Sequence, residues 1–89
     1  GIILVTILIN TDYSINKNIK ISSNGVPDFD KSQLTSDFKE FFINEYLKLN
    51  ESKKSSDEIL SELIKKSIRI SLKNQFTKKP EVKTHIIRI

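Results

Sequence analysis

Six cations form the densest group of chemically active side chains in the sequence, and all lie near its C-terminal end. Lysine supplies five of them, and a helical spacing makes Arg69 and Lys73 neighbours. Lysine suits contact with phosphate, whereas bidentate reading of bases needs arginine. The group therefore predicts at most a salt-sensitive, sequence-independent contact with an RNA backbone. The candidate residues are Lys65, Lys66, Arg69, Lys73, Lys78 and Lys79.

The distribution of charge along the chain leaves two interpretations open. Residues 1–64 hold seven lysines against ten Asp and Glu, a net −3, and residues 65–89 hold eight cations against Glu81, a net +7. Such asymmetry is typical of a surface that faces a polyanion. It is also typical of a solvated helix whose late cations complement the negative end of the helix dipole.

Residues that could support catalysis are sparse. His85 is the only histidine and there is no cysteine, whereas zinc sites use several such ligands. Asp28 and Asp30 lack the further oxygen ligands of a calcium loop. Neither a glycine-rich phosphate loop nor a nucleophile elbow occurs. We therefore expect no catalytic, cofactor-binding or metal-binding residue in this chain, and no small-molecule partner.

Three segments have the pattern of β-strands. Ile2–Ile9 is apolar on both alternating faces, which favours a strand covered on both sides or lying at a subunit contact. Ile15–Ile21 alternates, and should pair with the first strand as a hairpin with a long loop. Val82–Ile89 alternates as a third strand. The residues predicted for a subunit interface are Ile3, Val5, Ile7, Ile9, Ile87 and Ile89.

Two amphipathic helices are expected between the second and third strands. The first should run from Lys31 to Leu49 behind an Asp30 N-cap, with an aromatic-rich apolar face. The second should begin with a capping box formed by Ser55 and Glu58 and continue to Phe76. Apolar residues recur every four positions along it, and a polar connection separates the two helices.

Together these elements predict an α+β fold of two layers in the order β-β-α-α-β. A three-stranded sheet would be covered on one face by two antiparallel helices. The length of 89 residues predicts a single domain over 1–89 with a thin core. A start at Gly1 and the lack of methionine indicate a domain taken from a larger enzyme.

The apolar stretches indicate a location away from membranes. The run Ile2–Val5 is too short to span a bilayer, and no basic leader precedes it. We therefore expect no membrane partner. A chain without cysteine fits a cytoplasmic setting.

The order of elements and three short motifs carry a resemblance to a known family. Gly1 opens a long aliphatic strand, and the second strand runs into the turn Ser23–Val26. The second helix closes on Phe76–Pro80, read as F-T-K-K-P, and the chain ends in Ile86–Ile89, read as I-I-R-I. In these features the whole chain resembles the C-terminal domain of ribonuclease J, a metallo-β-lactamase superfamily enzyme. Asn24, Pro27 and Arg88 depart from that family's usual residues.

The resemblance implies a parent enzyme of RNA processing and mRNA decay with exonucleolytic and endonucleolytic activity. The zinc ions and catalytic residues of such an enzyme belong to other domains, so the resemblance implies no catalytic residue here. It implies a non-catalytic domain that assists oligomerisation, with copies of itself and the parent's catalytic domains as partners. The alternative is an accessory, non-specific RNA-binding module that uses the basic face of the second helix.

Overall fold

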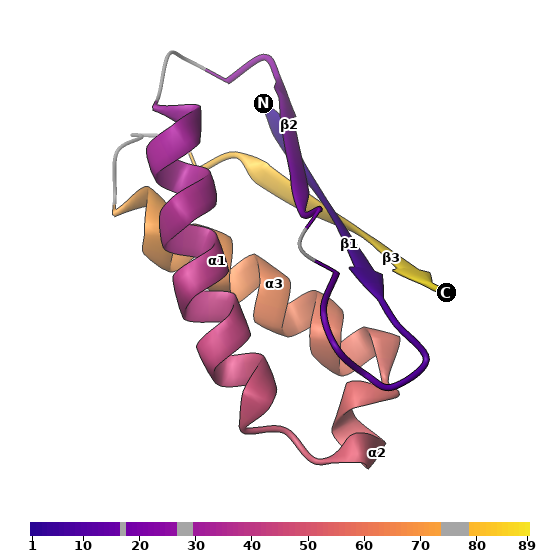
Figure 1. The fold of residues 1–89 in the computed structure, drawn as a ribbon. Helices are drawn as coiled ribbons and strands as arrows, with labels where there is room; N and C mark the ends of the chain where they lie inside the picture. Colours follow the sequence, from indigo (N-terminus) through magenta and orange to yellow (C-terminus); the bar gives the residue numbers. More distant parts are fainter. Residues whose placement is uncertain (17, 27–29, 74–78) are drawn as a thin grey trace.

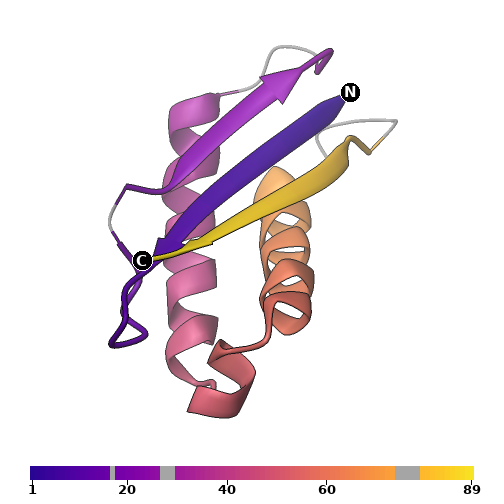
Figure 2. The ribbon, with the colours of Figure 1, turned by 90° about the vertical axis from the view of Figure 1, so that its right-hand side faces the viewer.

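The computed structural model describes residues 1–16, 18–26, 30–73 and 79–89. Within them lie a three-stranded sheet and three helices, and α1 and α3 cover one face of the sheet (Figures 1 and 2). The α+β class and the two-layer arrangement are therefore confirmed. The elements in chain order are β1 (Ile2–Ile9), β2 (Lys20–Asn24), α1 (Lys31–Leu47), α2 (Glu51–Lys54), α3 (Asp57–Leu72) and β3 (Glu81–Arg88).

The first strand lies at the centre of the sheet, in the order β2-β1-β3. Strand β1 pairs antiparallel with β2, as expected for the hairpin. The second strand is placed later than predicted, at Lys20–Asn24 and not Ile15–Ile21, and Ile15 forms only an isolated bridge with Ile9. Strand β1 pairs in parallel with β3 over its whole length, from Ile2 opposite Glu81 to Ile9 opposite Arg88. A parallel neighbour needs a long crossover, and the helical segment between β2 and β3 supplies it.

The core lies between the sheet and the two long helices. Ile3, Val5 and Ile7 of β1 are fully buried beneath them, as the period of two in a strand requires. Helix α1 contributes stacked aromatic rings, with the centroids of Phe38 and Phe42 5.3 Å apart. Burial of each large apolar side chain contributes about 1.5–3 kcal/mol. The fully buried partners on α3 are Leu60, Ile64 and Ile68.

The structure confirms the N-cap expected for the first helix and corrects the N-cap expected for the second. The carboxylate of Asp30 accepts from the Gln33 amide at the start of α1, as expected. Helix α3 is capped by Ser56, whose hydroxyl accepts from the Ile59 amide, so the capping box predicted at Ser55 is wrong. The hydroxyl of Ser55 instead lies 2.8 Å from the Glu51 carbonyl oxygen, because the expected polar connection contains the short helix α2.

The helix ends fall earlier than the sequence pattern predicts. Helix α1 ends at Leu47, although Leu49 still packs against the core. Helix α3 ends at Leu72 because Lys73 adopts a left-handed conformation, with φ of 51°. The predicted end at Phe76 lies outside the described residues.

Candidate interaction surface

The face of the sheet opposite the helices carries an apolar stripe, because β1 is apolar on both of its sides. Ile2 and Leu4 of β1 keep 36% and 38% of their surface exposed, and Leu8 is half-buried. Ile87 of β3 lies opposite Leu8 in the parallel register and is 37% exposed. These four residues are the outer stripe.

The structure corrects the predicted subunit interface on β1. Its four proposed β1 residues are at most 1% exposed, because α1 and α3 cover that face of the sheet. They belong to the core of the chain itself and cannot contact a second subunit. Ile87 and Ile89 do lie at the surface, and Ile89 is 60% exposed. The four corrected residues are Ile3, Val5, Ile7 and Ile9.

Cations flank the outer stripe on both sides. The pairing registers place Lys20 of β2 opposite Thr6 and Lys83 of β3 opposite Leu4. Lys20, Lys83 and His85 are all exposed. The outward-facing strand residues hold two lysines against one carboxylate, Glu81, so this face is largely apolar along its centre, apart from Thr6, and carries a small positive excess along its margins.

The predicted RNA-contact residues are only partly brought together. Lys65, Lys66 and Arg69 lie on α3 away from its buried stripe, and Lys73 is the C-cap of that helix. Lys66, Arg69 and Lys73 are exposed. Lys79 is exposed at a separate place, just before β3, and Lys78 lies outside the described residues.

Carboxylates offset part of the charge on α3. The Lys65 amino group lies 3.9 Å from a Glu62 oxygen, and that of Lys73 lies 3.8 Å from an Asp37 oxygen on α1. The pKa of Glu45 is lowered, chiefly by its hydrogen bond to Lys48 and in small part by Lys66. The positive excess of this helix face is therefore smaller than the sequence suggests.

Two groups of polar contacts fasten the ends of the sheet to the helices. The Tyr46 hydroxyl of α1 donates to the Tyr13 carbonyl oxygen in the loop after β1. Arg88 at the end of β3 donates two hydrogen bonds to an Asp57 oxygen, at 2.9 and 3.0 Å, and one to the Lys54 carbonyl at 2.8 Å. Sequence reasoning missed both, because partners more than 30 residues apart leave no local signal.

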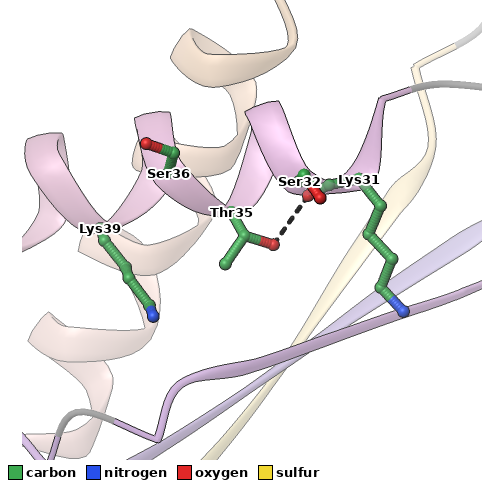
Figure 3. A pocket seen from close by; sticks show the side chains of 5 residues that line it. All are labelled: Lys31, Ser32, Thr35, Ser36 and Lys39. Carbon is green, nitrogen blue, oxygen red and sulfur yellow. Dashed lines mark hydrogen bonds between the residues drawn. The ribbon is translucent and has the colours of Figure 1, made fainter.

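A second positive surface, also missed by sequence reasoning, lies on α1. A hollow of about 520 Å³ lies along this surface. Among the residues that line it, the Lys31, Thr35 and Lys39 side chains point to the same side of the helix in Figure 3. Thr35 donates to the Lys31 carbonyl at 2.8 Å, which fixes the threonine side chain. These residues, the lysine flank, are Lys31, Ser32, Thr35, Ser36 and Lys39.

Neither a metal centre nor a membrane span is found in the described part of the chain. Among the described residues, no three His, Asp or Glu side chains lie close enough together to hold a metal ion. His85 lies alone on the outer sheet face. None of the described helices has the length and apolarity needed to cross a bilayer.

Fold and surface together define a small two-layer α+β domain with a partly apolar sheet face that no described helix covers. The family model of the ribonuclease J C-terminal domain matches residues 1–89, the whole chain. The chain therefore belongs to the ribonuclease J C-terminal domain family. A comparison with individually curated proteins finds no match.

Proposed function

We propose that this domain holds subunits of a ribonuclease J together through the outer face of its sheet. In this proposal it is a non-catalytic assembly module. The zinc-dependent cleavage of RNA in processing and decay takes place in other domains of a cytoplasmic parent enzyme. Its partners are a second copy of the same domain and the parent's catalytic domains.

The outer stripe is the observation that carries the proposal. Ile2, Leu4, Leu8 and Ile87 form an apolar stripe across two adjacent strands, interrupted only by Thr6, and among the described residues no helix covers it. An apolar surface on a sheet costs free energy in water, and exposed apolar patches are candidate interaction sites. Covering the stripe with a second copy would remove it from water and add apolar burial to a thin core.

The geometry favours assembly over RNA binding by α3. Lys65 on that helix and Lys73 at its C-cap lie within 4 Å of carboxylates, which would repel a phosphate backbone. The described part of the helix also offers no aromatic ring for base stacking, which single-strand binding commonly uses.

Analytical ultracentrifugation of the chain and two matched variants tests the proposal. Leu4→Lys places a charge in the outer stripe, whereas Ile70→Lys places one at a similarly exposed apolar position on α3, away from the sheet. We expect the wild-type chain and Ile70→Lys to self-associate and Leu4→Lys to stay monomeric. A wild-type chain that is monomeric at high micromolar concentration, or equal association of both variants, would contradict the proposal.

A further inference from the structure

The outer edge of β2 presents backbone groups that no described strand pairs with. Strand β2 is the terminal strand of the sheet. The Asn16 amide donates to the Leu8 carbonyl, so the even-numbered residues of β1 direct their backbone groups toward β2. Leu4 faces Ser22 in this register, and the neighbours Ile21 and Ser23 therefore direct their N–H and C=O groups outward.

The lysine flank gives the same side of the domain a positive charge. Figure 3 shows Lys31 and Lys39 extending from α1 toward the strand drawn below it, and the lining of the hollow includes no carboxylate. The two acidic residues in the middle of α1, Asp37 and Glu40, lie on the other flank, where they line a hollow shared with α3. The two lysines and the two carboxylates of α1 therefore lie on opposite flanks of the helix.

From these two features we infer that the edge of β2 is a docking site for an extended acidic segment of another protein. Such a segment would add to the sheet as a fourth strand and pair with the outward groups of Ile21 and Ser23. Its alternate side chains would lie on the helix side, where carboxylates meet Lys31 and Lys39.

The chemistry of the site identifies the occupant as peptide from another chain. A strand edge recognises alternating amide and carbonyl groups, which a nucleic acid backbone lacks. The lysine flank has neither arginine nor an aromatic ring for stacking on bases. In the sequence of this chain, carboxylates two positions apart occur only at Asp28 and Asp30, and Asp30 is engaged as the N-cap of α1.

A labelled peptide of about eight residues, alternating valine and glutamate, is the probe for the site. Fluorescence anisotropy with the full chain should detect binding that weakens as salt rises. The double variant Lys31→Glu/Lys39→Glu should lose about tenfold in affinity, since two exposed ionic contacts become repulsive. Lys66→Glu on α3 is the matched control and should bind as the wild-type chain does.

Changes in the peptide and one edge variant separate strand pairing from simple charge attraction. A peptide with N-methylated backbone amides, or with lysine in place of glutamate, should not bind. Ser23→Pro removes an outward N–H but keeps the β1 ladder, so this variant should fold and fail to bind. Saturating peptide should slow amide hydrogen exchange at Ile21 and Ser23.

Three outcomes would overturn the inference. They are equal binding of the N-methylated peptide, unchanged binding by the double lysine variant, and a single-stranded RNA that binds the flank while the acidic peptide does not. None of them bears on assembly through the outer stripe, which lies on the open face of the sheet and is tested by Leu4→Lys.

Discussion

Tyr46 joins the loop after β1 to two helices that follow much later in the chain. Its side chain is buried in the core, and its hydroxyl donates to the carbonyl of Tyr13, which has a left-handed φ of 67°. The Lys54 amino group of α2 lies 5.1 Å from the centre of the Tyr46 ring. A single side chain thus fixes the loop after β1 against α1 and α2.

The variant Tyr46→Phe should lower the free energy of unfolding by about 1–2 kcal/mol, because the Tyr13 carbonyl loses its partner in a partly buried place. Urea unfolding measures the change. Tyr13→Phe is the control, since the Tyr13 hydroxyl accepts only an exposed hydrogen bond from Ser55. This variant should lower the free energy of unfolding by less than Tyr46→Phe does. An equal loss of unfolding free energy in both variants would contradict the structural role of the Tyr46 hydroxyl.

The same residue predicts how stability changes in alkali. Burial raises the pKa of Tyr46 above its ordinary value of 10.0, so the fold favours the protonated phenol. This contribution is fully present below the unfolded pKa and is lost as the pH rises through the folded pKa. Unfolding from pH 8 to 11 should therefore show a loss of stability that is smaller in Tyr46→Phe. An identical pH profile for both proteins would show that another group is responsible.

Strand β3 is joined to the helical layer by side chains as well as by the core. Near its middle the Thr84 and Ser61 hydroxyls lie 2.7 Å apart, and near its end Arg88 binds Asp57 and the Lys54 carbonyl. The arginine that departs from the family pattern thus has a structural role. It connects the C-terminal end of β3 to the start of α3.

Replacing Arg88 with Ala should destabilise the chain by a measurable amount, about 0.5–1 kcal/mol, because the Arg88 and Asp57 side chains are 34% and 67% exposed and water screens their attraction. Arg88→Lys should recover only part of the loss, since lysine lacks the planar fork that reaches both acceptors. Thermal unfolding measures the stability of both Arg88 variants, and Lys83→Ala is the control. Equal thermal stability of the Arg88→Ala and Lys83→Ala variants would contradict the structural role proposed for Arg88.

The elements themselves were largely predictable, because each depends on local patterns. Alternation in Val82–Ile89 and the four-residue repeat from Leu60 to Leu72 gave the correct element types, and Asp30 gave the correct cap. The buried side of β1 was not predictable, since both of its faces are apolar and the choice depends on where the helices pack. The contacts of Tyr46 and Arg88, and the lysine flank beside β2, likewise require the assembled fold.

In the whole molecule, the outer face combines an apolar centre with cations at its margins. Two copies that meet through this face bring Lys20 and Lys83 of each partner into one interface. Salt screens their repulsion, with a Debye length near 30 Å at 0.01 M and near 8 Å at 0.15 M. Self-association should therefore strengthen between these two salt concentrations in sedimentation equilibrium. RNA binding would show the opposite dependence, and weaker association at higher salt would contradict contact through this face.

The central claim is that the outer stripe is the surface through which subunits meet. An isotope-filtered NMR experiment on mixed labelled and unlabelled chains tests it most directly. We expect intermolecular contacts from the methyl groups of Leu4, Leu8 and Ile87, and none from those of Ile59 or Ile70 on the helical side. Intermolecular contacts confined to the helices, or none at concentrations where the wild-type chain associates, would contradict it.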